Sequence, residues 1–138
     1  MEEDYVSYEL AKKLKKLGFN KPCDSYYDCH SNLKHYAPTD IVNRNTNGHH
    51  RHSCSAPTLW CAWKWLRYEK NIDVDVNYNT KDYEIVSYEW SIFTLSPCDF
   101  IDSADDTYTS YEEALEAGMM RAVEILLSGE LTEEDDDK

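Results

Sequence analysis

Residues 72–78, with the sequence IDVDVNY, alternate strictly between apolar and polar side chains. In an extended chain this alternation puts the apolar residues on one face and Asp73, Asp75 and Asn77 on the other. The pattern is typical of a half-buried strand in an antiparallel sheet with one wet face. We therefore expect a sheet built around this segment, with both aspartates in solvent.

Further strands are predicted on either side of it. Residues 23–37 predict a short hairpin, because tyrosines and a leucine flank a polar centre. Residues 79–82 have the polar composition of a turn. Residues 83–90 then predict the returning strand, with Ile85 or Val86 facing inward according to the register.

Three shorter segments complete the strand prediction. Residues 91–95 (SIFTL) are predicted to extend the sheet by another strand. Residues 38–54 predict a long polar loop, which a short strand at Ile41 and Val42 could interrupt. Residues 96–109 predict a second loop, which is acidic and contains a proline.

The first and last helices are predicted from apolar periodicity together with capping signals. Residues 7–17 carry leucines at i, i+4 and i+7, and residues 111–128 repeat apolar side chains at three and four. The expected capping residues are Ser7 and Gly18 for the first helix and Ser110, Glu113 and Gly129 for the last. The acidic residues of the last helix, Glu112, Glu113 and Glu116, are expected on its outer face.

The second helix is predicted over residues 58–70, after Pro57 and with Thr58 as its N-cap. Its core-facing residues should be Leu59, Ala62, Trp63 and Leu66. At 100° per residue, Trp60, Lys64 and Arg67 lie nearer the outside.

These elements predict an α+β fold, with one antiparallel sheet of about four to five strands and three helices on one face. The expected order is helix, strand, strand, helix, strand, strand, an optional further strand, and helix. Residues 1–130 are predicted to form a single domain, and residues 131–138 an acidic disordered tail.

The net charge of −13 is distributed unevenly along the chain. Residues 1–33 carry −1, residues 34–70 carry +4, and residues 71–138 carry −16. Phosphate backbones repel such a second half, so general nucleic-acid binding is not expected. The same surface would attract a basic partner, including a protein that itself grips nucleic acid.

The N-terminal residues lack an apolar stretch, and no run of about 18 apolar residues occurs, so neither a signal peptide nor a membrane span is expected. Five cysteines, an odd number, favour reduced thiols and a cytoplasmic location. One disulfide, between Cys23 and Cys29, stays open as an alternative.

Metal binding and catalysis are both weakly supported. Cysteine and histidine could ligate zinc, but their spacing does not match the paired ligands of structural zinc sites. The residues concerned are Cys29, His30, His49, His50, His52 and Cys54. No nucleophile elbow or other catalytic motif occurs. We therefore expect no metal, no cofactor and no enzymatic activity.

Aromatic and basic residues coincide only near the second helix. Aromatic residues make up 13% of the chain, and such residues are enriched at interfaces. A flat anionic ligand such as a nucleotide could stack on Trp60 beside Arg44, Arg51, Lys64 and Arg67. Alternatively, this edge packs under the 38–54 loop.

Three stretches resemble a family of small proteins encoded by gut Bacteroidales and by their phages and mobile elements. The stretches are DYVSYELAKKLKKLGF, SAPTLWCAWKWLRYEKNIDVDV and SYEEALEAGMMRAVEIL, and together they cover roughly half of the chain. The family's APT…KWLR segment usually carries an acid where this chain has Cys61. The resemblance implies a small cytoplasmic protein, often phage-borne, but no particular activity.

Two functions are therefore expected. The first is non-enzymatic binding of a host or phage protein, in which the acidic half, including Glu112, Glu113 and Glu116, or the aromatic edge occludes the partner. A phage accessory or anti-defence role would fit it. The second is a sponge for nucleotides or cyclic nucleotides at Trp60. A metal- or cysteine-dependent enzyme is a weak third alternative, and a homodimer would cover an exposed sheet edge.

Overall fold

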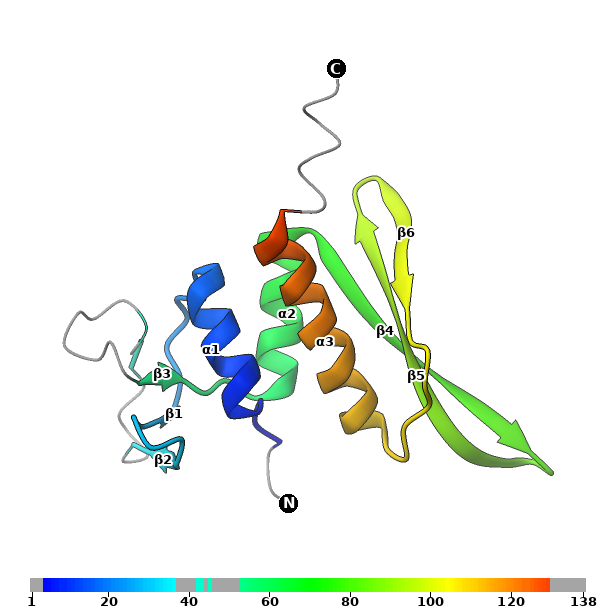
Figure 1. The fold of residues 1–138 in the computed structure, drawn as a ribbon, viewed down its shortest axis with the longest axis horizontal. Helices are drawn as coiled ribbons and strands as arrows, with labels where there is room; N and C mark the ends of the chain where they lie inside the picture. Colours follow the sequence, from blue (N-terminus) through cyan, green and yellow to red (C-terminus); the bar gives the residue numbers. More distant parts are fainter. Residues whose placement is uncertain (1–3, 37–41, 44, 46–52, 130–138) are drawn as a thin grey trace.

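The computed structural model describes residues 4–36, 42–43, 45 and 53–129. Three helices and six strands occur in these residues, so the α+β class is confirmed. The helices are α1 (Tyr8–Leu17), α2 (Leu59–Lys70) and α3 (Tyr111–Ser128). They lie between two groups of strands (Figure 1). In this described part, no helix has the length and hydropathy that crossing a membrane requires.

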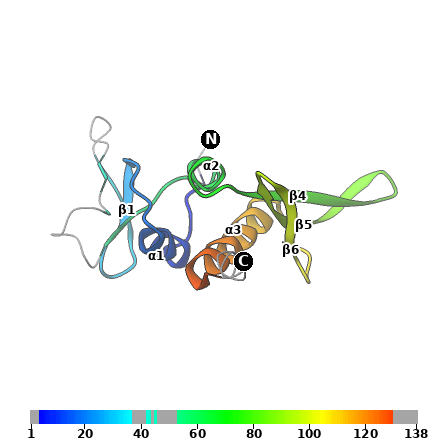
Figure 2. The ribbon, with the colours of Figure 1, turned by 90° about the horizontal axis from the view of Figure 1, so that it is seen from above.

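The strands form two antiparallel sheets, so the prediction of one sheet of four to five strands is wrong. The first sheet has the order β2-β1-β3 and consists of β1 (Ser25–Tyr27), β2 (Leu33–His35) and β3 (Cys54–Ser55). The second has the order β4-β5-β6 and consists of β4 (Ile72–Lys81), β5 (Glu84–Leu95) and β6 (Cys98–Ser103). The helices separate the two sheets, which prevents their edges from meeting (Figures 1 and 2).

The predicted helices and their caps are confirmed. Ser7 accepts a hydrogen bond from the Leu10 N–H, Thr58 from Cys61 and Ser110 from Glu113. Gly18 and Gly129 adopt left-handed conformations after α1 and α3. Each cap satisfies backbone groups that a helix end leaves unpaired, which is why these local signals located the helices.

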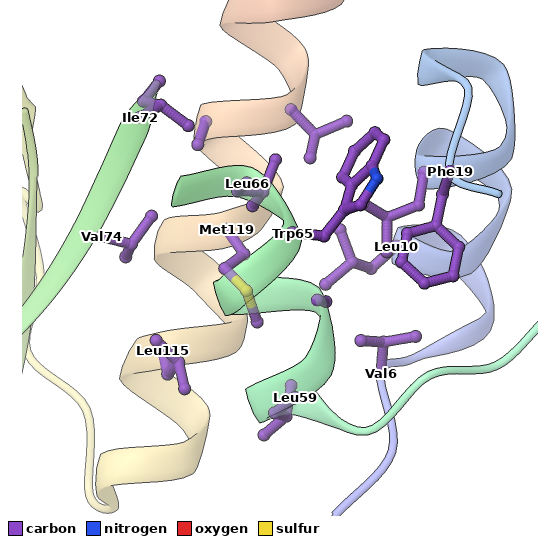
Figure 3. Packing of buried hydrophobic residues seen from close by; sticks show 14 of the residues in the cluster. Val6, Leu10, Phe19, Leu59, Trp65, Leu66, Ile72, Val74, Leu115 and Met119 are labelled. Carbon is purple, nitrogen blue, oxygen red and sulfur yellow. The ribbon is translucent and has the colours of Figure 1, made fainter. Parts of the chain in front are cut away.

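The hydrophobic core is formed where the three helices meet and where α2 and α3 face the second sheet (Figure 3). The ring of Trp65 contacts that of Phe19, with centroids 5.2 Å apart, and joins α2 to the turn after α1. We expected Trp63 on the core-facing side of α2, and it does pack against the core, but Trp65, which we did not predict there, is the more deeply buried residue. Trp65 is 6% exposed, whereas Trp63 is only half-buried, because α2 buries a second face against the turn at Phe19.

The predicted hairpin at residues 23–37 is confirmed as β1 and β2. Within the predicted 38–54 loop, Cys54 begins β3, and Val42 forms an isolated bridge with Cys23. Ile41 and the predicted acidic tail at 131–138 lie outside the described residues.

The β4–β5 ribbon turns later than predicted. Its turn residues are Asp82 and Tyr83, which both have positive φ, and a bulge lies between Asn79 and Thr80. Positive φ at both central residues is the geometry of a type I′ hairpin turn, which matches the twist of the two strands. The predicted turn at residues 79–82 is therefore wrong, because β4 continues to Lys81.

The far end of the ribbon extends past the helices (Figures 1 and 2). For this reason Ile85 and Val86 are both exposed, contrary to the prediction that one of them faces inward. Residues 91–95 continue β5 and do not form a separate strand. The third strand is β6, which lies within the predicted 96–109 loop.

Candidate functional site

The exposed face of α2 carries two tryptophans and an arginine in contact with one another. Trp60, Trp63 and Arg67 are spaced at i, i+3 and i+7, which places them on one side of the helix. The Arg67 guanidinium lies 5.0 Å from the centroid of the Trp63 ring. Trp63 meets Trp60 edge-on, with centroids 5.7 Å apart. Trp60 ends this row and is 52% exposed.

Tyrosines from α3 and β5 continue the row of rings. Tyr111, the first residue of α3, lies 5.9 Å from Trp60 with an interplanar angle of 30°. Tyr88 of β5 contacts Tyr111 at 6.2 Å. The backbones of Tyr88 and Tyr108 exchange two hydrogen bonds of 2.9 and 2.8 Å, which positions Tyr88. Three separate elements thus build one aromatic surface.

Carboxylates of β4 lie beside this row. The Arg67 guanidinium donates to Oδ1 of Asp73 at 2.5 Å, and Asp73 is only 7% exposed. The expectation that Asp73 faces solvent is therefore wrong, because α2 packs its arginine over this end of the strand. Asp75, two residues further on, is exposed as expected.

The pKa of Asp75 is raised to about 6, first by partial burial and then by the hydrogen bond to Asp73 and the charge of Asp73. The charge of Arg67 opposes this rise. Burial also raises the pKa of Tyr111, with added contributions from the charges of Asp75, Glu112 and Asp73. The carboxylate charges therefore act on Tyr111, which belongs to the aromatic row. We call the row and its carboxylates the aromatic–acidic surface: Trp60, Trp63, Tyr88, Tyr111, Asp73, Asp75 and Glu112.

The residues predicted to bind a nucleotide are only partly brought together. Trp60 and Arg67 share the α2 face, but Arg67 is already paired with Asp73. Lys64 lines a neighbouring hollow of about 420 Å³ with Lys21, Trp65 and Tyr68 among others. Arg44 and Arg51 lie outside the described residues. Among the described residues, the charges that act on the Tyr111 ring hydroxyl are those of Asp75, Glu112 and Asp73.

The three glutamates of α3 that we predicted to bind a partner do not share a face. Glu112 and Glu113 are exposed. Glu116 points toward α1, where its carboxylate accepts hydrogen bonds from the Ser7 backbone N–H at 3.2 Å and from the Ser7 hydroxyl. Its predicted place on the outer face is therefore wrong, because α1 packs against that side of α3. Burial raises the pKa of Glu116, although the bonds from Ser7 oppose the shift.

The cysteines offer no redox or metal centre in the described part of the chain. All five are free, and no described group of three potential ligands could hold a metal ion. Burial raises the pKa of Cys23 to about 12 and that of Cys54 to about 11, so both remain thiols at neutral pH. His49, His50 and His52 lie outside the described residues.

A second hollow, of about 540 Å³, lies at the opposite end of the molecule beside α1. Its lining includes Tyr8, Lys12, Lys15 and Lys16. Lys12 pairs with Glu9 at 3.4 Å and lies over the Tyr8 ring, and Lys15 donates to the Ser53 carbonyl at 2.6 Å. Two of the three lysines therefore already have partners within the chain.

Sequence reasoning identified Trp60 but missed Tyr88, Tyr111 and the Asp73–Asp75 pair as its neighbours. The alternation at residues 72–78 did place both aspartates on one face of the strand. Nothing local indicated that α2 would lie over that face, since this contact joins residues of different elements. The known proteins provide no further guide: no family model, curated protein or solved structure matches the chain.

Proposed function

We propose that this protein is a non-enzymatic binding protein, and that the aromatic–acidic surface docks a basic segment of a partner protein. The observation that carries the proposal is the exposed ring of Trp60, which lies 5.9 Å from the tilted ring of Tyr111, a residue on which the charges of Asp75 and Glu112 act. Aromatic faces and carboxylates both attract guanidinium and ammonium groups. Exposed tryptophan and tyrosine are also the residues that most often dominate binding energy at interfaces.

The charge of the chain supports the same kind of partner. Residues 71–138 carry −16, and this segment contributes Asp73, Asp75, Tyr88, Tyr111 and Glu112 to the surface. Such a field accelerates the encounter with a basic protein and repels nucleic acid. The binding protein would act by occluding its partner. The resemblance to proteins of phages and mobile elements extends the proposal to an accessory or anti-defence role against a host component.

A labelled arginine-rich peptide tests the proposal directly, with fluorescence anisotropy measured on the full chain. Trp60→Ala should weaken binding at least tenfold, because truncating a central interface aromatic typically costs about 2 kcal/mol or more. Tyr68→Ala is the matched control, since Tyr68 is an aromatic residue of the same helix that is 75% exposed and lies outside the surface. Equal affinity of both variants, or no binding by the unmodified chain, would contradict the proposal.

The nucleotide alternative is tested by thermal unfolding with a panel of nucleotides and cyclic nucleotides. A ligand present at 100 times its dissociation constant stabilises the folded chain by about 2.7 kcal/mol. Pairing of Arg67 with Asp73 favours the basic peptide over these anions. An unchanged midpoint for every nucleotide would count against the sponge.

A further inference from the structure

The outer edge of β4 lies directly beside the aromatic–acidic surface. In the order β4-β5-β6, β4 is an end strand, and within the described residues no strand pairs with its outer edge. Edge strands present a row of backbone donors and acceptors to which another strand can add. An added strand can bond only those N–H and C=O groups of β4 that point away from β5.

Two hydrogen bonds determine that direction. The indole Nε1 of Trp63 donates to the Val74 carbonyl at 3.0 Å from the side of α2, so the backbone of Val74 points outward. The Asn71 carbonyl instead accepts from the N–H of Leu95 on the neighbouring strand. Because successive residues of a strand direct their backbone groups to opposite edges, Val76 and Tyr78 point outward together with Val74.

The usable edge is bounded at both ends. Trp63 already occupies the Val74 carbonyl, and the bulge between Asn79 and Thr80 interrupts the strand geometry. Between these points the N–H and C=O groups of Val76 and Tyr78 can bond an added strand. A segment of about five residues, the ordinary length of a strand, fits this stretch.

The side chains beside the edge define what kind of strand would fit. On one face lie Asp75 and Asn77, and Asn77 is paired across the sheet with Glu89. On the other face lie Val76 and Tyr78, and Tyr78 is 61% exposed. Since the side chains of an added strand alternate with the same period, one half of them meets carboxylates and the other half meets apolar surface.

We infer that the partner segment binds β4 as an added strand in which basic and apolar residues alternate. This inference rests on the proposed function and specifies the ligand class of the same surface. Basic side chains lie over Asp75 on one face of the strand, and the opposite face carries Tyr78, whose partner Tyr88 contacts Tyr111. Apolar side chains pack on Val76 and Tyr78. Strand addition provides the affinity through backbone bonds, and the alternation provides the specificity.

Charge favours such a segment over a second copy of the chain. Residues 72–90 carry five carboxylates, Asp73, Asp75, Asp82, Glu84 and Glu89, against the single Lys81. Pairing the β4 edges of two copies would bring two such negative ribbons together, which is unfavourable. A basic segment neutralises the ribbon instead.

Synthetic peptides with alternating arginine and valine test the inference by isothermal titration of the full chain. One peptide is N-methylated at the residues whose N–H faces β4, and a second at the residues facing away. The first should bind about 5- to 150-fold more weakly than the unmodified peptide, because two backbone hydrogen bonds of about 0.5–1.5 kcal/mol each are lost. The second should bind like the unmodified peptide.

The outcomes separate this inference from the proposed function. If both methylated peptides bind equally well and Trp60→Ala still weakens them, the surface binds basic segments but strand addition is wrong. If none of the peptides binds, the proposed function fails as well. If the chain sediments as a dimer that excess peptide does not dissociate, and mutation of the β4 edge does dissociate it, the edge belongs to a second copy and the inference is overturned.

Discussion

Asp75 holds a carboxyl group next to that of Asp73, whose charge Arg67 already balances. Arg67 thus faces two carboxylates: it hydrogen-bonds Asp73, and its charge only partly offsets the rise in the pKa of Asp75. The pKa of Asp75 in the folded chain is about 6, against an ordinary value of 3.8. Between these values the folded chain holds a proton that the unfolded chain has lost. The contribution of Asp75 to the free energy of unfolding must therefore fall as the pH rises from about 4 to about 6.

Replacing this carboxylate with an amide should make the protein more stable at neutral pH. Asp75→Asn removes the ionisation that opposes folding, so the variant should exceed the unmodified chain in stability above pH 6 and match it below pH 4. Urea unfolding at several pH values measures this difference. Asp99→Asn, at an exposed aspartate of β6, is the control and should leave the pH dependence unchanged. If the free energy of unfolding of Asp75→Asn depended on pH in the same way as that of the unmodified chain, the raised pKa of Asp75 would be contradicted.

The same substitution should weaken binding of a basic peptide. The carboxylate that costs stability in the free chain gains a cationic partner in the complex, so stability and binding should change in opposite directions. This opposition is common where a binding site keeps a charge that folding alone would not favour. If Asp75→Asn gained stability without any loss of affinity for the peptide, Asp75 would not be part of the docking surface.

At the scale of elements, α3 is positioned by hydrogen bonds to α1 and by close packing against the second sheet. Glu116 joins α3 to the cap of α1 through Ser7. On its other side α3 approaches the second sheet so closely that Gly118 leaves no room for a side chain. A Cβ at this position would lie 2.5 Å from Cγ1 of Val74 and 2.9 Å from Cβ of Trp90. These contacts fix the position of the N-terminal end of α3, and with it Tyr111 and Glu112, relative to β4.

Cutting the polar contact should destabilise the fold. Glu116→Ala leaves the partly buried Ser7 N–H without its acceptor, which should cost about 1–3 kcal/mol in the free energy of unfolding. Glu112→Ala, on an exposed position of the same helix, should change it by less than about 0.5 kcal/mol. Urea denaturation provides both numbers. If both substitutions changed the free energy of unfolding equally, the hydrogen bonds between Glu116 and Ser7 would not stabilise the α1–α3 contact.

Filling the close contact should also be costly. Gly118→Ala forces α3 away from Val74 and from the base of the Trp90 side chain, and overpacking of this kind costs about 1–3 kcal/mol. Glu124→Ala provides the comparison, because Glu124 is an exposed position of α3 and alanine favours helix there. Thermal unfolding of the two variants should show a lower midpoint for Gly118→Ala alone. An unchanged midpoint would show that the helix can shift freely.

These elements also show which parts of the structure the sequence could predict. Ser7, Thr58 and Ser110 cap their helices through residues three positions away, so short-range patterns located all three helices. Glu116 looks like any solvated acid in a local window, and its partner lies 109 residues earlier. The division into two sheets and the contact of Arg67 with Asp73 likewise depend on how elements pack. The hydrophobic periodicity of the sequence does not indicate these long-range contacts.

At the scale of the whole molecule, the two ends differ in charge and in chemistry. Lys12, Lys15 and Lys16 of α1 line a hollow together with Cys54 of the first sheet. The acidic β4–β5 ribbon extends at the opposite end of the molecule (Figure 2). A basic partner should therefore approach in one orientation, with the ribbon end first. Because exposed charges are screened within about 10 Å at 0.1 M salt, the association rate should fall as salt is added. Stopped-flow measurements at increasing salt would test this, and a salt-independent rate would contradict electrostatic steering.

The most direct test of the docking surface is hydrogen exchange of backbone amides in the full chain, with and without the arginine–valine peptide. The amides of Val76 and Tyr78 should exchange more slowly in the complex, and the resonances of the Trp60 ring should shift. The amides around Lys12 and Lys16 at the other end should not change. Protection confined to the α1 end, or no change at Val76, Tyr78 and Trp60 while the peptide binds, would contradict the aromatic–acidic surface as the site.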